Sequence, residues 1–190
     1  MPRLFTALEI PDAAADALTM LRGGLPGARW IDRENYHVTL RFFGDVDGAT
    51  ARDLFALLAE SRRRGPIDVT LDALGSFGGD RPRSLFARVA PSTDLARFQT
   101  AQEKLARQAG LEPEGRKYTP HVTLARLRDV RAAEVATFIA RAGFFPTLRF
   151  TAERFVLLSS RDSVGGGPYV IEAAYPFDSV QPAMAAAPAW

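Results

Sequence analysis

The pattern of apolar and polar residues predicts a series of β-strands. Residues 67–73 alternate strictly, so the apolar side chains of this segment share one face of a strand and the polar side chains share the other. The apolar stretch that begins at Leu4 and ends before Pro11 predicts an earlier strand. We expect further strands over residues 84–90, 148–158 and 169–175.

Between these strands, apolar residues recur at helical spacing. The segment from Ala51 to Leu58 has the i, i+3, i+4, i+7 spacing of an amphipathic helix, with Thr50 and Asp53 as a capping box. Three further helices are expected after Pro11, from Ser92 to Gly110, and over residues 135–142. Helices mixed with short strands that are covered on one face predict an α+β fold with antiparallel sheets.

The chain also repeats itself. His37-Val38-Thr39-Leu40 recurs identically 84 positions later as His121-Val122-Thr123-Leu124, and the strand at Leu4 is echoed 81 positions later at Leu85. We therefore expect one domain over residues 1–180, built from repeats of approximately 1–80 and 81–178. The repeats are expected to form two lobes related by a pseudo-twofold axis, each with an antiparallel sheet flanked by helices, and an active cleft between them. The Ala/Pro-rich segment 181–190 is expected to be a flexible tail.

Composition excludes several classes of protein. The 190 residues contain no cysteine, which excludes a disulfide framework, thiolate catalysis and cysteine-based zinc sites, and fits a cytoplasmic location. No apolar run is long enough to span a membrane, so we expect no membrane partner. The formal net charge is only +2, but 22 of the 24 basic residues are arginine, which suits phosphate groups. A general arginine bias explains this equally well, so RNA as a partner is permitted rather than required.

The two histidines of the chain both open the repeated tetrapeptide. Side chains at i and i+2 of a strand share a face, so His37 and Thr39 point together, as do His121 and Thr123. If the two repeats pack about a pseudo-twofold axis, two imidazoles and two hydroxyls surround one centre. A single His-x-Thr on a strand is usually a packed structural histidine, and it is the repetition that favours a functional site.

This set of side chains suits metal-free chemistry at phosphorus. An in-line attack needs a base for the incoming oxygen and an acid for the leaving oxygen, and histidine can serve as either near neutral pH. Threonine hydroxyls and an arginine would stabilise the oxygens that gain charge. Two histidines are fewer than the three or four ligands of a usual zinc site, so we expect neither a metal nor a cofactor.

Other features have simpler interpretations. Phe5, Phe42, Phe43 and Phe86 are expected to pack in the core rather than to stack on bases, because strand phenylalanines usually point inward. Arg62–Arg64 are expected to form a solvated helix end.

Paired His-x-Thr motifs about eighty residues apart resemble the signature of the 2H phosphoesterases. The sequence is most similar to the RNA 2′,3′-cyclic phosphodiesterase branch, also called the 2′–5′ RNA ligase or LigT-like group. The residues that carry this resemblance are Arg3–Pro11, Trp30, Glu34–Gly44, Tyr118–Arg126 and Ser163–Tyr169. The resemblance implies a bilobal fold and metal-independent opening of a 2′,3′-cyclic phosphate to a 2′-phosphate, with a possible reverse reaction that forms a 2′–5′ linkage without ATP.

The resemblance also implies roles for individual residues. His37 would donate a proton to the leaving 3′-oxygen, His121 would activate water, and Thr39 and Thr123 would hold phosphate oxygens. Arg126, five positions after the second histidine, would bind phosphate or the RNA backbone. Strict alternation puts Arg126 on the opposite face from His121, so this role requires the strand to end or bulge between them. Arg41 shares the face of His37 by the same alternation and is a further candidate phosphate contact.

Three functions remain open at this point. The first is the phosphodiesterase, acting on RNA that ends in a 2′,3′-cyclic phosphate, for example a tRNA fragment. The second is a non-catalytic module that binds RNA ends or nucleotides. The third is a phosphodiesterase that acts on small cyclic nucleotides or 2′–5′ oligonucleotides. Two related lobes in one chain make a monomer the natural expectation.

Overall fold

The computed structural model describes residues 3–61, 65–143, 145–160 and 167–178. Arg62–Arg64, expected to form a helix end, and the expected tail 181–190 lie outside these residues. The described chain forms nine strands, four α-helices and a short 3-10 helix, η1. In chain order these are β1 (Arg3–Glu9), α1 (Asp12–Thr19), β2 (Ala28–Trp30), η1 (Arg33–Asn35), β3 (His37–Asp45), α2 (Gly48–Glu60), β4 (Ile67–Phe77), β5 (Ser84–Val89), α3 (Thr93–Gln108), β6 (His121–Leu127), α4 (Ala132–Arg141), β7 (Leu148–Ala152), β8 (Arg154–Ser160) and β9 (Tyr169–Pro176).

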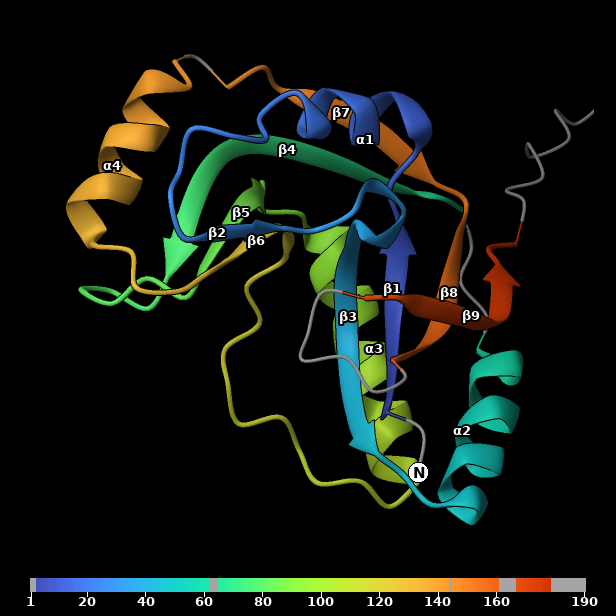
Figure 1. Ribbon diagram of the computed structural model, residues 1–190. Helices are drawn as coiled ribbons and strands as arrows, with labels where there is room; N and C mark the ends of the chain where they lie inside the picture. Colours follow the sequence, from blue (N-terminus) through green and yellow to red (C-terminus); the bar gives the residue numbers. More distant parts are fainter. Residues whose placement is uncertain (1–2, 62–64, 144, 161–166, 179–190) are drawn as a thin grey trace, which may run out of the picture.

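The strands form one antiparallel sheet in the order β7-β4-β5-β6-β3-β1-β8-β9, with β2 paired to β6. In Figure 1, β3 and β1 run vertically, whereas β4 arches across the top of the molecule. The α+β fold with antiparallel strands is confirmed. The expected separate sheet in each lobe is not found, because β3 and β6 join the two halves through the pair Val38–Val122.

The two sequence repeats are interleaved in this sheet. β4 belongs to the first repeat, yet both of its neighbours, β5 and β7, belong to the second. Similarly, β8 of the second repeat pairs with β1 of the first. Each half of the sheet therefore contains strands from both repeats.

The main core lies on one face of the sheet. The side chains of Val38, Leu40, Val122 and Leu124 are fully or almost fully buried there. Helix α3 lies behind β3 and β1 in Figure 1 and packs against β3. Because side chains alternate along a strand, this burial directs the intervening residues of both His-x-Thr motifs to the opposite face.

Two examples show how local details differ from the sequence expectation. Helix α2 begins earlier than expected: its N-cap is Asp47, whose side chain accepts hydrogen bonds from the backbone N–H groups of Ala49 and Thr50. The expected strand 148–158 is divided into β7 and β8, which lie at different positions in the sheet. The helix that follows Ser92 is as expected, with the Ser92 hydroxyl accepting from the N–H of Leu95. Within the described ranges, no helix has the length and apolar character needed to cross a membrane.

Candidate active site

The two His-x-Thr motifs meet at the junction between β3 and β6. Val38 and Val122 form the antiparallel pair that joins these strands. Continuing this register by one residue sets His37 across from Thr123, and Thr39 across from His121. The local twofold axis of the pair therefore relates the two histidines and the two threonines on one face of the sheet.

Each imidazole is held by an equivalent contact to the backbone carbonyl group two residues earlier. Nδ1 of His37 lies 2.8 Å from the carbonyl oxygen of Asn35, and Nδ1 of His121 lies 2.7 Å from that of Thr119. A carbonyl oxygen can only accept, so Nδ1 carries the proton in both rings. The lone pair of each neutral imidazole is therefore on Nε2, the nitrogen that remains available to a substrate.

Aromatic rings enclose both imidazoles. The His37 ring centroid lies 5.1 Å from that of Phe5 and 5.1 Å from that of Tyr169, and the Tyr169 contact is edge-on. The His121 centroid lies 4.9 Å from Phe77, also edge-on, and 5.2 Å from Phe86. Each histidine therefore has one aromatic neighbour from the adjacent strand and a second from the edge of the site.

This enclosure favours the neutral imidazole. Burial lowers the pKa of His37 from 6.5 to about 4, and the nearby charges of His121 and Arg126 act in the same direction. Burial, together with Arg126, also lowers the pKa of His121. The hydrogen bonds to Asn35 and Thr119 oppose these effects without cancelling them. A bound phosphate anion would raise both pKa values, because an opposite charge favours the imidazolium.

A bulge in β6 brings Arg126 to the face of His121. The pairing of β6 with β5 shifts between Thr123 and Ala125, and both Leu124 and Ala125 are buried. Because of this bulge, Arg126 lies on the same face as His121 and Thr123, and it is exposed. Its charge influences the pKa of both histidines. The bulge that this role of Arg126 requires is therefore present.

The corresponding bulge in β3 has the opposite consequence for Arg41. The pairing with β1 shifts between Thr39 and Arg41, so Arg41 no longer shares the face of His37. Its side chain is buried and forms an ion pair with Glu103 of α3. The expectation that Arg41 faces the site is wrong, because alternation fails at the bulge. The residue that returns to the face of His37 is Phe42, at the same +5 position as Arg126 in the other motif.

The phenylalanines divide into buried and exposed groups. Phe43 is in the main core, as expected. Phe5 and Phe86 are buried, but each contacts a site histidine. Phe42 is 41% exposed and stacks on Phe5, so the expectation that it lies in the core is wrong.

Phe77, which the sequence reasoning did not single out, is 37% exposed and stacks on Phe86. Its only sequence signal is its place at the end of the alternating strand, directly before Gly78 and Gly79.

Asn35 connects His37 to the start of β9. Besides its backbone contact to His37, its side-chain oxygen accepts a hydrogen bond from the N–H of Tyr169, at 3.1 Å. Gly167 passes so close that a Cβ added there would clash with the Asn35 side chain, and its φ is +93°. Glycine is required at this position to bring Tyr169 against the His37 ring.

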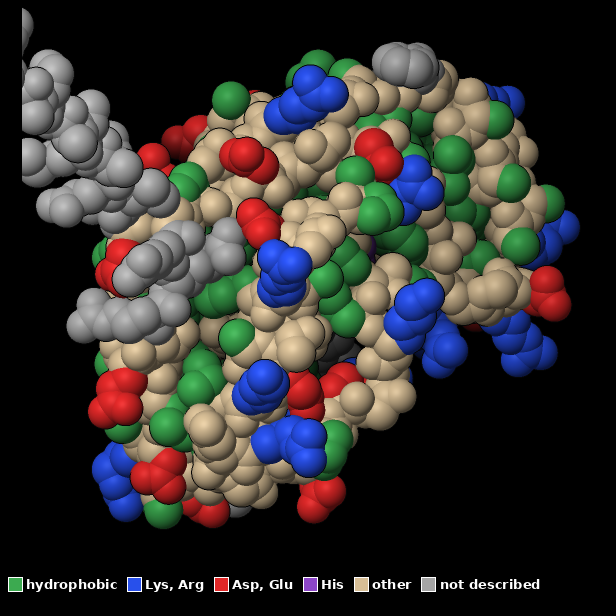
Figure 2. Space-filling view, turned by 180° about the vertical axis from the view of Figure 1, so that it is seen from behind, with side chains coloured by type: hydrophobic (Ala, Val, Ile, Leu, Met, Phe, Trp, Pro, Cys, Tyr) green, Lys and Arg blue, Asp and Glu red, His purple; other side chains and the backbone are tan. Residues whose placement is uncertain are grey.

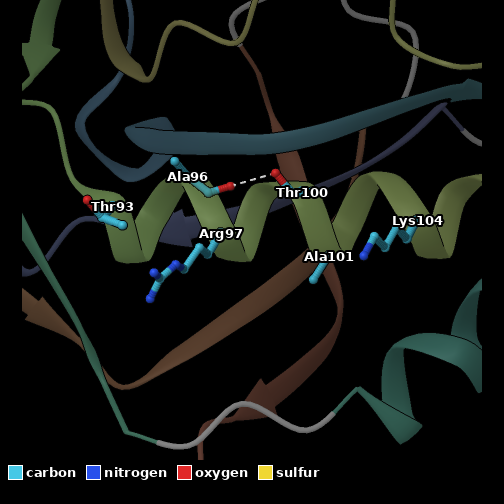
Figure 3. Close-up of a pocket in the computed structure, with 6 residues that line it drawn as sticks. All are labelled: Thr93, Ala96, Arg97, Thr100, Ala101 and Lys104. Carbon is cyan, nitrogen blue, oxygen red and sulfur yellow. Dashed lines mark hydrogen bonds between the residues drawn. The ribbon is translucent and has the colours of Figure 1, made fainter.

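Other parts of the surface add little to this site. Among the described residues there is no group of three or more potential metal-ligating side chains. A hollow of about 470 Å³ lies on α3, and neither histidine lines it (Figure 3). Its lining consists of Thr93, Ala96, Arg97, Thr100, Ala101 and Lys104. On the face seen in Figure 2, basic and acidic side chains are intermingled, so there is no extended patch of one charge.

Comparison with known proteins yields related sequences. One relative, from Aeropyrum pernix, is 36% identical over 110 residues, covering 57% of this chain and 61% of that protein. Another, from Geobacillus stearothermophilus, is 30% identical over 128 residues, covering 64% and 41%. A third, from Bacillus subtilis, is 30% identical over 130 residues, covering 66% and 71%. All three are named RNA 2′,3′-cyclic phosphodiesterase. The chain thus spans less than two thirds of the first two relatives.

Solved structures share the fold. LigT from E. coli in complex with 3′-AMP superimposes with a TM-score of 0.74 at 22% identity, covering 93% of this chain and 99% of that one. The protein TT0787 from Thermus thermophilus gives 0.75 at 22% identity, covering 92% and 97%.

The family model described as the 2′-5′ RNA ligase superfamily matches residues 10–163, which include both His-x-Thr motifs and most of the sheet. The chain therefore belongs to the 2′-5′ RNA ligase superfamily.

Proposed function

We propose that this protein is a metal-independent phosphodiesterase that opens the 2′,3′-cyclic phosphate at the end of an RNA and leaves a 2′-phosphate. The observation that carries the proposal is the pair of imidazoles related by the Val38–Val122 bridge, each held through Nδ1 with Nε2 available. The names of the relatives support the same activity.

The two histidines have complementary roles in this reaction. Nε2 of His121 accepts a proton from water as the water oxygen forms a bond to phosphorus. The bond between phosphorus and the 3′-oxygen breaks, and protonated His37 gives its proton from Nε2 to that oxygen. The products are a 2′-phosphomonoester and a free 3′-hydroxyl, and the net change is the addition of one water.

The remaining side chains of the site stabilise charge. Thr39 and Thr123 are partly exposed on the face of the histidines, where their hydroxyls can donate to the non-bridging phosphate oxygens. Arg126 adds a fixed positive charge near both rings. In the absence of substrate the low histidine pKa values keep both rings neutral at pH 7. The phosphate anion therefore helps to generate the protonated His37 that the reaction uses.

The substrate is proposed to be RNA, for example a tRNA fragment, rather than a small phosphodiester. Phe42 and Phe77 each expose a ring at the edge of the site, and exposed aromatic faces stack on bases irrespective of sequence. A 5′-hydroxyl in place of water would react through the same two histidines and form a 2′–5′ linkage without ATP. RNA as substrate and the absence of cysteine both fit a cytoplasmic location, and we expect the protein to act as a monomer.

Turnover in the presence of excess EDTA tests the proposal. Purified protein is incubated with an oligoribonucleotide that ends in a 2′,3′-cyclic phosphate and, separately, with the 2′,3′-cyclic mononucleotide of the same terminal base. We expect loss of the cyclic phosphate from both, with the higher kcat/KM for the oligonucleotide. Salt-dependent binding without product would favour a binding module. Preference for the mononucleotide would favour a phosphodiesterase of small cyclic nucleotides.

A further inference from the structure

The segment between α3 and β6, residues 109–120, contains no helix or strand but ends directly at His121. Figure 1 shows it as a long yellow connection that loops away from the sheet. Its penultimate residue, Thr119, supplies the carbonyl oxygen that holds Nδ1 of His121. The orientation of His121 therefore depends on how this irregular segment is anchored.

Arg41 provides an anchor from the buried side of β3. Its Nη2 donates a hydrogen bond of 2.7 Å to the carbonyl oxygen of Glu112, and its Nη1 donates to the carbonyl oxygen of Phe42. Its Nε lies 2.5 Å from Oε2 of Glu103, in an ion pair whose geometry departs from that of an ideal hydrogen bond. The Arg41 side chain is 7% exposed and that of Glu103 is 21% exposed. One guanidinium therefore links β3, α3 and the connecting segment.

Two further contacts hold the same segment. The Glu103 side chain accepts a hydrogen bond of 3.2 Å from the N–H of Glu114 through Oε1. The Tyr118 hydroxyl donates one of 3.1 Å to the carbonyl oxygen of Thr39. The segment is thus held at Glu112, Glu114 and Tyr118, and Tyr118 directly precedes Thr119. The Asn35 carbonyl that holds His37 belongs to η1 and lies outside this set.

We propose that Arg41, paired with Glu103, is a positioning residue for His121. It fixes the connecting segment so that the Thr119 carbonyl keeps the proton of His121 on Nδ1 and directs Nε2 toward the substrate. The kinetic consequence rests on the proposed function, whereas the effect on the His121 ring does not. Arg41 thereby acts on the site through His121, not through contact with phosphate.

The ring nitrogens of the two histidines report this effect directly. In ¹⁵N NMR spectra of the labelled protein at about pH 7.5, where both rings are neutral, we expect each to show the Nδ1–H tautomer. In Arg41→Met, which keeps an unbranched side chain but removes the donors, His121 should become a mixture of tautomers while His37 is unchanged. Because the chain has only two histidines, His37 is an internal control for folding. Unchanged nitrogen shifts of His121 in folded Arg41→Met would overturn the proposal.

Kinetics provide a second readout. In Arg41→Met we expect kcat for the cyclic phosphate to fall about 10- to 100-fold, the range caused by misplacement of a catalytic group. KM should change less than threefold, because the Arg41 guanidinium bonds to Phe42, Glu112 and Glu103 and not to the Thr39, Thr123 or Arg126 side chains. Arg41→Lys keeps the charge and should recover part of kcat. A rise in KM with unchanged kcat would contradict the proposal.

Matched variants separate positioning from stability. Arg3→Met removes an exposed ion pair between Arg3 of β1 and Asp45, the last residue of β3. This variant should leave both histidine spectra and kcat unchanged. If Arg41→Met does not fold, Arg41→Met/Glu103→Leu removes both buried charges together, which is better tolerated than leaving one unpaired. The double variant should show the same change in His121, and normal His121 nitrogen shifts in it would equally overturn the proposal. Absence of turnover in the wild type would refute the proposed function, while the nitrogen shifts would still decide the role of Arg41.

Discussion

The enclosure of His37 should make the stability of the fold depend on pH. Its pKa is lowered from 6.5 to about 4, chiefly by burial. Below pH 6.5 the unfolded chain therefore binds a proton that the folded protein does not, and stability falls as the pH decreases toward 4. The pKa of His37 differs between the unfolded and folded states by about 2.5, and each pKa unit corresponds to about 1.4 kcal/mol. The complete effect on the free energy of unfolding is therefore about 3 kcal/mol. About 2 kcal/mol of this should be lost between about pH 7.5 and pH 5.

Urea unfolding of the wild type and of His37→Asn isolates this contribution. Asparagine keeps an N–H group near the position of Nδ1 but does not titrate, so the loss of about 2 kcal/mol should be absent from its unfolding free energy. Titrating groups that do not interact with His37 are common to both proteins and cancel in the comparison, whereas His121, whose charge acts on His37, contributes a smaller difference. Equal pH dependence of the two proteins, within about 0.5 kcal/mol, would show that the folded protein does not suppress protonation of His37.

Three further outcomes are expected. Replacing His37 or His121 with alanine should reduce kcat about 10²–10⁴-fold in a hydrolysis assay, and undiminished activity of either variant would refute its role. The profile of kcat/KM against pH should be bell-shaped with its maximum below pH 6.5, because burial lowers the pKa of both histidines and one of them must be protonated; a maximum above pH 8 would contradict this. Arg126→Gln should lower kcat/KM about 10- to 100-fold and weaken its dependence on salt, whereas Arg128→Gln, at an exposed residue that follows the site, should do neither.

The paired motif could be found from sequence because it depends on local rules. Alternation along a strand places His37 with Thr39 and His121 with Thr123, and the exact recurrence of the tetrapeptide implies related surroundings. The structure brings the two motifs together at a single residue pair, Val38–Val122. The pairing of β3 with β6 joins segments 84 residues apart, and the repeat was the only sequence feature that suggested it.

The arginines show where alternation ceases to be a guide. Each motif strand has a bulge after its threonine, and beyond the bulge the residues swap faces of the strand. Arg41 therefore points into the interior and Arg126 lies at the surface. Each bulge includes a leucine, Leu40 or Leu124, and leucine is common in regular strands. No residue type at these positions therefore predicts a bulge from the sequence. The buried partner of Arg41, Glu103, lies on a helix 62 positions later, and only the tertiary packing reveals their pairing.

The interleaving of the two repeats in one sheet also depends on tertiary contacts, so the sequence did not predict it. The repeat suggests two lobes, each with its own sheet, but the exchange of β4 and β8 between the halves is set by strand pairing across the chain. Alternation within residues 67–73 predicts that β4 is a strand and which of its faces is buried. It does not predict which strands lie beside it.

The identity of the terminal phosphate after hydrolysis tests the central claim most directly. RNA with a 2′,3′-cyclic end is treated with the protein in excess EDTA, and the product is compared with authentic 2′- and 3′-phosphorylated standards by chromatography and ³¹P NMR. A 2′-phosphate is expected, because protonated His37 assists departure of the 3′-oxygen while His121 activates water on the opposite side of phosphorus. A 3′-phosphate, or hydrolysis that stops in EDTA and returns when a divalent metal is added, would contradict the two-histidine account.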